Sequence, residues 1–167
     1  MQFSELIQKR QSIRKYSSPP VEPEKITRIL EAANRAPSAG NYQAFEIYVV
    51  RTLEQLKRLA AATWDQKFIA EAQAALIICQ NASRCQYPGA ETFSLEDATI
   101  ATTLAMLAIT DLGLATCWIG AFAPDAVGKA MNIAEGHKPM AILPIGYPGE
   151  QPERTTRREL AELVHEL

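Results

Sequence analysis

The first residues in this chain with the chemistry of a site form a short run near the N-terminus, Arg10-Gln11-Ser12-Ile13-Arg14. In an extended chain, residues 10, 12 and 14 share one face because successive side chains alternate sides. Two guanidinium groups and a hydroxyl on one face would form a donor set suited to phosphate oxygens. The run therefore predicts an anion site, and the alternative is a solvated basic face without a ligand.

A second basic group, Arg154, Arg157 and Arg158, lies near the C-terminus. If the two ends of the chain pack together, these arginines join the N-terminal pair. Each charge-assisted hydrogen bond contributes roughly 1.5–3 kcal/mol, so three or four would anchor a phosphate firmly. The alternative is two unrelated basic patches.

Other common kinds of site find little support in the residues. The two histidines, His137 in a polar loop and His165 near the C-terminus, give a hydrolytic nucleophile no evident base. No cluster of His, Cys, Asp or Glu has metal-ligand spacing, so we expect no metal centre. Gly-x-Gly-x-x-Gly and Walker-type runs are absent. Any phosphate must therefore be held by side chains.

Length and composition predict one soluble domain over residues 1–167, because 47% of the chain is hydrophobic. A net charge of −2 does not indicate the basic surface that nucleic-acid binding requires. Cys79 and Cys117 lie in apolar runs, which predicts core thiols in a reducing cytoplasm. Residues 1–10 lack the apolar stretch of a signal peptide, and the apolar run 98–109 is too short to span a bilayer. We therefore expect a cytoplasmic protein without membrane contact.

Helical and strand patterns must position these residues. An amphipathic helix begins near residue 23 and stops at Pro37, where the small and polar loop 37–43 leads into a strand at 45–50. Thr52 and Gln55 form a capping box for a helix that runs to about residue 62. Further apolar strands are expected at 76–79, 114–119 and 140–145, a short helix at 125–131 and helical spacing at 160–164.

The segment 95–111 predicts a long helix that is apolar on nearly all sides, after an irregular stretch at 83–93. Glu96 and Asp97 would favour the start of this helix through its dipole. One domain of this size rarely surrounds a helix completely, and the small side chains along 98–108 permit close approach of another helix. We therefore expect a dimer.

Four segments, in this order along the chain, carry a family resemblance. They are Arg10-Gln11-Ser12-Ile13-Arg14-Lys15-Tyr16, Ala36-Pro37-Ser38-Ala39-Gly40-Asn41-Tyr42-Gln43, Gly113-Leu114-Ala115-Thr116-Cys117-Trp118-Ile119-Gly120-Ala121-Phe122 and Leu143-Pro144-Ile145-Gly146-Tyr147-Pro148. Together they resemble the successive signatures of the nitroreductase family of FMN-dependent oxidoreductases, over about residues 3–164. Their order and spacing are the specific part of the resemblance.

The resemblance implies an α+β fold with a mainly antiparallel central sheet flanked by helices, in an intertwined homodimer with two FMN sites at the interface. Arg10, Ser12 and Arg157 would bind the FMN phosphate, and Arg14 would lie beside the flavin pyrimidine. The residues implied at the cofactor are Arg10, Gln11, Ser12, Arg14, Pro37, Ser38, Ala39, Asn41, Gln43, Gln66, Ile119, Gly120, Ala121, Arg157 and Arg158.

By the same resemblance, residues 37–43 would reach the flavin from the other subunit, and residues 119–121 would pack at the ring with a backbone N–H near N5. Either Asp65 or Gln66 occupies the place of an amide that touches the flavin in many relatives. Two positions depart from the family pattern: Ala44-Phe45 replaces a frequent Pro-Trp, and Thr155 replaces a frequent lysine. Either Arg154 or Arg158 would then assist at the phosphate. The short chain implies a pocket that is open or closed by residues 83–93.

The implied activity is hydride transfer from NADH or NADPH to flavin N5, followed at the same site by a nitroaromatic, quinone or related small-molecule acceptor. Arg14 would stabilise the negative charge of the reduced ring. The sequence has no diagnostic residue for specialised family chemistry such as reductive dehalogenation, enone reduction or flavin fragmentation, which stays an alternative. A non-catalytic flavin-binding module and a purely structural dimerisation domain are the others.

Overall fold

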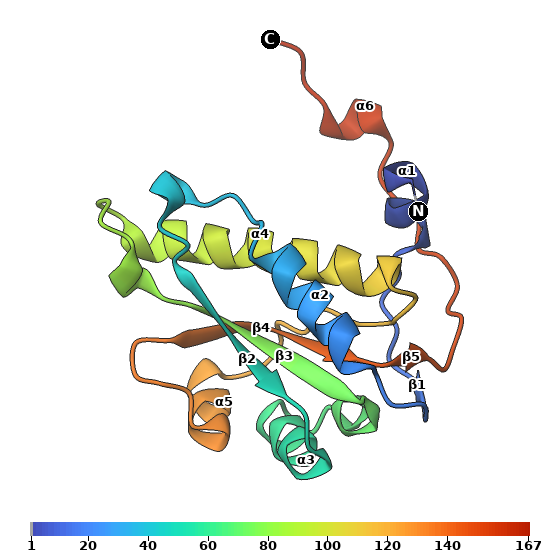
Figure 1. The fold of residues 1–167 in the computed structure, drawn as a ribbon. Helices are drawn as coiled ribbons and strands as arrows, with labels where there is room; N and C mark the ends of the chain where they lie inside the picture. The colour runs from blue at the N-terminus through green and yellow to red at the C-terminus, as the bar shows by residue number, and fades with distance from the viewer. Residues whose placement is uncertain (1) are drawn as a thin grey trace.

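Three antiparallel strands form the centre of the computed structural model, which describes residues 2–167 (Figure 1). They are β2 (Phe45–Val50), β3 (Ala74–Gln80) and β4 (Lys138–Ile145), in the order β2-β3-β4. Every residue of β3 is buried, as expected of a central strand between two layers. A separate antiparallel pair joins β1 (Tyr16–Ser17) to β5 (Tyr147–Pro148). The expected α+β fold with a mainly antiparallel sheet is confirmed.

Helices cover both faces of this sheet. Leu76 and Ile78 of β3 pack with α2 (Pro23–Ala33) and α4 (Ala90–Asp111). Ala75, Ile77 and Cys79 point to the other face, because side chains alternate along a strand, and pack with α3 (Leu53–Ala62) and α5 (Pro124–Met131). The capping box of Thr52 and Gln55 is present at the start of α3. The remaining elements are α1 (Phe3–Lys9), η1 (Ala39–Asn41), η2 (Lys67–Glu71), η3 (Ala82–Arg84) and α6 (Leu160–Leu163).

The prediction of a continuous strand at residues 114–119 is wrong. This segment makes isolated bridges to three places: Thr116 to Ser12, Ala115 to Gly146 and Ile119 to Ile142. Because its backbone groups are divided among these neighbours, no regular ladder forms. The segment is nevertheless buried from residue 114 to residue 117, as its apolar character predicts.

The long helix also differs from the prediction at its N-terminal end. α4 begins at Ala90, so part of the expected irregular stretch 83–93 is helical. By length and composition alone, this 22-residue helix could cross a membrane. Ala98, Ala105 and Ile109 are instead fully buried with α2 and the sheet, as in the core helix of a folded domain.

Cys79 and Cys117 belong to the core as predicted, and Cys85 is buried as well. All three thiols are unpaired. Burial, together with the nearby Glu46 carboxylate, raises the pKa of Cys79 to about 12. This thiol therefore stays protonated at neutral pH and is a poor nucleophile.

Candidate functional site

The two ends of the chain meet at a cavity of about 540 Å³. Residues lining it from the N-terminal side are Ile7, Gln8, Arg10, Gln11, Ser12 and Arg14, and those from the C-terminal side are Pro152, Glu153, Arg154, Thr155 and Arg157. The predicted meeting of the two basic groups is therefore present. Arg158 is not among the lining residues, so Arg154 and Arg157 are the arginines that the tail supplies here.

The N-terminal side of this cavity is an extended segment that hydrogen bonds to the rest of the chain keep in place. α1 ends at Lys9, and the following segment pairs with residue 116: Ser12 lies in a parallel bridge with Thr116, and the Ile13 amide donates to the Thr116 carbonyl at 3.0 Å. Two further bonds attach it to the tail. The Arg14 amide donates to Glu150 Oε1 at 2.7 Å, and Gln11 Nε2 donates to the Pro152 carbonyl at 3.2 Å.

The cavity is rich in unpaired positive charge. Among residues 2–167, no ion pair involves Arg10, Arg14 or Arg154. Arg157 Nη1 bonds only to its neighbours, at 3.0 Å to Thr155 Oγ1 and 3.1 Å to the Thr156 carbonyl. Glu153 supplies one carboxylate to the lining. An anion that enters would therefore find guanidinium donors without carboxylate partners.

The loop 37–43 is held in an unusual backbone conformation. Gly40, Asn41 and Gln43 have φ of 55°, 58° and 49°, a region that residues with side chains seldom adopt. Ser38 Oγ accepts a hydrogen bond from the Gln43 amide at 3.1 Å, which closes the loop. A Cβ on Gly40 would lie 2.8 Å from Tyr87 Oη and 2.9 Å from Tyr42 Cε2, so a larger residue would require these rings to shift as well as a strained φ.

The Asp97 carboxylate of α4 accepts hydrogen bonds from both ends of this loop. Its Oδ1 accepts from the Ala39 amide at 2.9 Å and its Oδ2 from the Ala44 amide at 3.1 Å, and the residue is 2% exposed. The predicted role of Asp97 at the start of a helix is wrong, because α4 begins seven residues earlier. An acid on the buried face of an apolar helix is the signal that could have identified it.

Gln66 links its own segment to residues 119–121. Its Nε2 donates to the Thr63 carbonyl at 3.0 Å and to the Ala121 carbonyl at 2.9 Å. The neighbouring Asp65 carboxylate lies 3.6 Å from Lys67 Nζ instead. Gly120 is exposed, and a Cβ there would meet only Trp118 Nε1 at 3.7 Å. The structure therefore brings Gln66, and not Asp65, into hydrogen-bond contact with residues 119–121.

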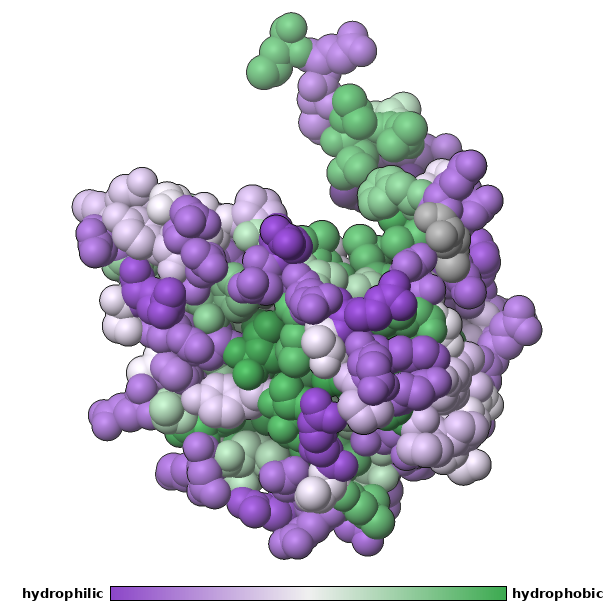
Figure 2. Space-filling view, in the orientation of Figure 1, coloured by the Kyte–Doolittle hydropathy of each residue, from purple (hydrophilic) through white to green (hydrophobic). Residues whose placement is uncertain are grey.

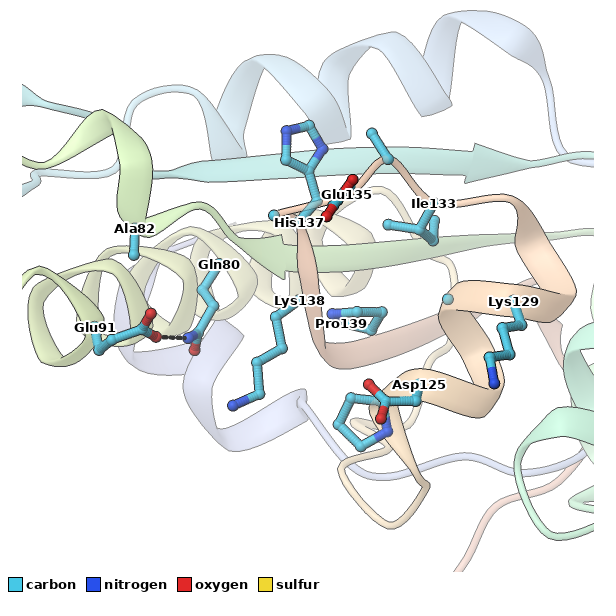
Figure 3. A pocket seen from close by; sticks show the side chains of 14 residues that line it. Gln80, Ala82, Glu91, Asp125, Lys129, Ile133, Glu135, His137, Lys138 and Pro139 are labelled. Carbon is cyan, nitrogen blue, oxygen red and sulfur yellow. Dashed lines mark hydrogen bonds between the residues drawn. The ribbon is translucent and has the colours of Figure 1, made fainter.

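The loop 37–43 and the arginine cavity lie toward opposite ends of α4 within one chain (Figure 1). A second cavity, of about 430 Å³, is lined by charges of both signs that include Glu91, Asp125, Lys129 and Lys138 (Figure 3). It has no arginine, and its two lysines lie among three carboxylates, those of Glu91, Asp125 and Glu135. We therefore place the candidate site at the arginine cavity.

Comparison with known proteins agrees with this architecture. The model of the nitroreductase family matches residues 7–86 and 62–147. A Methanothermobacter thermautotrophicus protein, provisionally named NADH dehydrogenase/NAD(P)H nitroreductase, is 33% identical over 91% of this chain and 80% of its own length. The FMN reductase [NAD(P)H] of Bacillus subtilis is 27% identical over 93% of this chain and 69% of its own length. The crystal structure of a Clostridium difficile nitroreductase family protein is 32% identical, with a TM-score of 0.87, over 99% of this chain and 98% of that one. The chain belongs to the nitroreductase family.

Proposed function

We propose that this chain is an FMN-dependent NAD(P)H oxidoreductase that works as a homodimer. The observation that carries the proposal is the cavity where Arg10, Ser12 and Arg14 face Arg154 and Arg157. Guanidinium groups and a hydroxyl are the donors that a phosphate monoester prefers. The names of two relatives, FMN reductase [NAD(P)H] and NADPH-flavin oxidoreductase, support a flavin and a nicotinamide donor.

The residues of the cavity fit the phosphate end of FMN. Arg10, Ser12 and Arg157 would hold the phosphate, and Arg154 would assist in preference to Arg158 because it lines the cavity. FMN, when bound, supplies two-electron transfer between a reduced nicotinamide and a small-molecule acceptor such as a nitroaromatic or a quinone. The chain's part is to hold the cofactor, to place charge beside it and to leave one face accessible.

Other segments would frame the ring. Residues 119–121 would pack against it, with Gln66 keeping the Ala121 carbonyl in place and Gly120 leaving room for close approach. Residues 37–43 of the second subunit would reach it from the other side, through Pro37, Ser38, Ala39, Asn41 and Gln43. The separation of this loop from the cavity within one chain supports a site shared between two subunits (Figure 1).

Apolar side chains on the two ends of the chain support the dimer. The C-terminal tail projects from the body of the molecule and carries hydrophobic residues around α6 and at its end (Figure 2). Leu160 is 72% exposed, and Leu163, Val164 and Phe3 of α1 are exposed as well. A projecting apolar segment is typical of one that packs on another subunit.

Arg14→Ala is expected to slow reduction of the bound flavin about tenfold, because one well-placed charge contributes roughly 1–2 kcal/mol at a developing negative charge. The hydrogen bond to Glu150 uses the Arg14 backbone amide and survives the change. Anaerobic stopped-flow reduction with NADH and NADPH, beside a flavin-binding titration, measures both effects. Arg14→Lys is the control that keeps the charge. A loss of FMN affinity with an unchanged reduction rate would place Arg14 at the phosphate instead.

An anaerobic absorbance spectrum tests the function itself. The purified protein is reconstituted with FMN and recorded before and after addition of NADH or NADPH. We expect flavin peaks that bleach and then return with oxygen or a nitroaromatic. A yellow protein that does not bleach would be a flavin-binding module, and a protein that binds no FMN would refute the proposed cofactor.

A further inference from the structure

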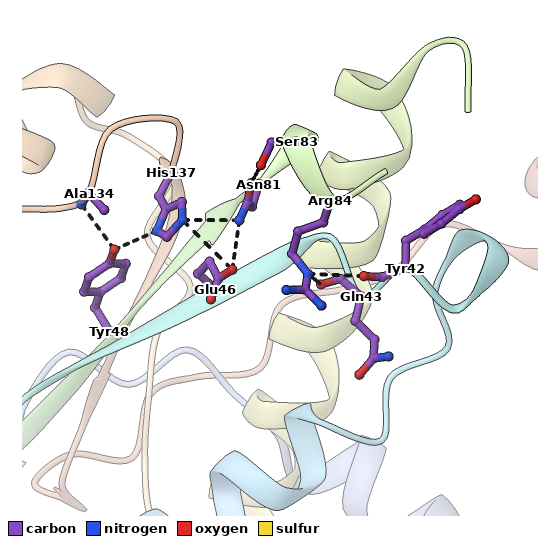
Figure 4. A network of polar contacts seen from close by, with 9 residues as sticks. All are labelled: Tyr42, Gln43, Glu46, Tyr48, Asn81, Ser83, Arg84, Ala134 and His137. Atoms are coloured by element: carbon purple, nitrogen blue, oxygen red, sulfur yellow. Dashed lines mark hydrogen bonds and ion pairs between the residues drawn. The ribbon is translucent and has the colours of Figure 1, made fainter. Parts of the chain in front are cut away.

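Asn81 is the centre of a polar network at the end of β3 (Figure 4). The residue is 5% exposed, its Nδ2 donates to Glu46 Oε1 at 2.8 Å, and its Oδ1 accepts from Ser83 Oγ at 2.6 Å. A carboxylate can only accept hydrogen bonds, so the amino side of the Asn81 amide must face Glu46. The orientation of this amide is thereby determined.

This orientation determines the proton on His137. His137 Nε2 lies 3.2 Å from Asn81 Nδ2, so the ring nitrogen must be the acceptor. The ring proton of the neutral imidazole is then on Nδ1, which lies 2.7 Å from Tyr48 Oη and donates to it. The same phenol oxygen accepts from the Ala134 amide at 3.2 Å. The network therefore accommodates only the neutral form of His137.

The other side of Asn81 holds the loop 37–43. The backbone N–H of Asn81 donates to the Ala44 carbonyl at 2.9 Å, and the backbone carbonyl of Asn81 accepts from the Arg84 backbone N–H at 3.2 Å across η3. Arg84 Nε in turn donates to the carbonyls of Tyr42 at 3.3 Å and Gln43 at 3.1 Å. Asn81 and η3 thus connect His137 to the outer edge of the loop.

We propose that Asn81 is a positioning residue that makes the conformation of the loop 37–43 depend on the protonation of His137. This inference rests on the proposed function, because it assigns that loop to the flavin. Protonation of Nε2 would set an N–H donor against the Asn81 amino group, while Glu46 Oε1, 4.0 Å from Nε2, would accept the new proton. The Asn81 amide cannot turn to relieve this contact, because Glu46 still requires its amino group. The His137 ring and the Asn81 side chain would therefore move apart, which strains the bond from Ser83 Oγ to Asn81 Oδ1 and loosens the hold of η3 and Arg84 on the loop.

The charged surroundings of His137 allow this change. Glu46 and Tyr48 of β2 contact its ring, and Glu135 and Lys138 lie close to it in the chain. The other titratable groups nearby are Glu91, Asp125 and Lys129, which line the second cavity together with His137 (Figure 3). Glu46 is the carboxylate that lies within ion-pair distance.

Nitrogen NMR of the ¹⁵N-labelled protein without cofactor tests the coupling. The chain has two histidines, so His165→Gln is a matched control for His137→Gln. At about pH 8 we expect a protonated Nδ1 and a bare Nε2 on His137. From about pH 8 to about pH 6, the backbone amide signals of Gly40 and Gln43 should shift together with the ring signals of His137. These shifts should be unchanged in His165→Gln and absent in His137→Gln. A proton on Nε2 at about pH 8, or loop shifts that survive His137→Gln, would overturn the proposal.

FMN titration adds the functional readout. The FMN phosphate ionises in the same pH range, so wild type is compared with His137→Gln at each pH. We expect a lower pH to weaken FMN binding about threefold more in wild type than in His137→Gln, because a single hydrogen bond contributes about that much. Asn81→Asp should reverse this difference, because its carboxylate accepts from the protonated ring. Equal pH dependence in all three proteins would overturn the proposal, whereas absence of FMN binding at every pH would refute the proposed function and leave the NMR result to decide the coupling.

Discussion

Arg10→Ala is expected to weaken FMN binding about 10- to 100-fold, because a hydrogen bond to a charged group contributes roughly 1.5–3 kcal/mol. Arg10 lines the cavity and has no ion-pair partner among residues 2–167, so its guanidinium is available to the phosphate. Quenching of flavin fluorescence during titration measures the dissociation constant. Riboflavin, which lacks the phosphate, should bind wild type and variant equally.

The matched control for this change is Arg28→Ala, on the exposed side of α2 and outside the cavity lining. It removes the same charge and should leave FMN binding unchanged. Equal loss of FMN and riboflavin affinity in Arg10→Ala would mean that Arg10 supports the fold instead of the phosphate. An effect as large in Arg28→Ala would attribute the loss to overall charge.

Tail arginines extend the same argument. Arg154 and Arg157 line the cavity and Arg158 does not, so alanine at either of the first two should weaken FMN binding and alanine at Arg158 should not. Sequence patterns alone left this choice open, because all three arginines lie within five residues. Only the path of the tail past the N-terminal segment distinguishes them.

Local patterns were enough to predict much of the fold. The capping box at Thr52, the proline at the start of α2 and the apolar run of β3 are interactions between residues close in sequence, and each is present. The start of α4 had no such signal. Its N-cap is Gly89, with φ of 85° and no side-chain cap, so Glu96 and Asp97 give the first recognisable signal of a helix start, several residues too late.

Contacts between distant segments account for the features that sequence patterns do not reveal. The sequence places His137 in a polar loop, yet it bonds to Tyr48 and Asn81, which are more than 50 residues away. Glu46 and Tyr48 share one face of β2 because they are two residues apart, and β2 alone cannot reveal what lies opposite. Asp97 was missed for the same reason, since its partners lie 53 and 58 residues away.

Asp97→Asn is expected to lower the melting temperature by roughly 4–8 °C. The substituted amide keeps one acceptor but turns an N–H₂ group toward a backbone N–H, and one unsatisfied buried donor costs about 2 kcal/mol. In a domain of this length, each kcal/mol shifts the melting temperature by about 2–4 °C. Glu96→Gln is the control, because it removes the same charge from an exposed neighbour on α4.

The loop should be affected more than the rest of the molecule by Asp97→Asn. Both bonds of the Asp97 carboxylate end on the loop, at Ala39 and Ala44, whereas Ala98 and Ala105 keep α4 packed in the core. Hydrogen exchange should therefore quicken at residues 39–44 before it quickens in β3. If the loop also reaches the flavin of a second subunit, FMN affinity should fall while the phosphate cavity is unchanged, so riboflavin and FMN should lose affinity equally. Asp97→Asn should thus lower the affinity for FMN and riboflavin equally, whereas Arg10→Ala should lower the affinity for FMN alone. This contrast would show that the loop contacts the flavin ring and that the cavity contacts the phosphate.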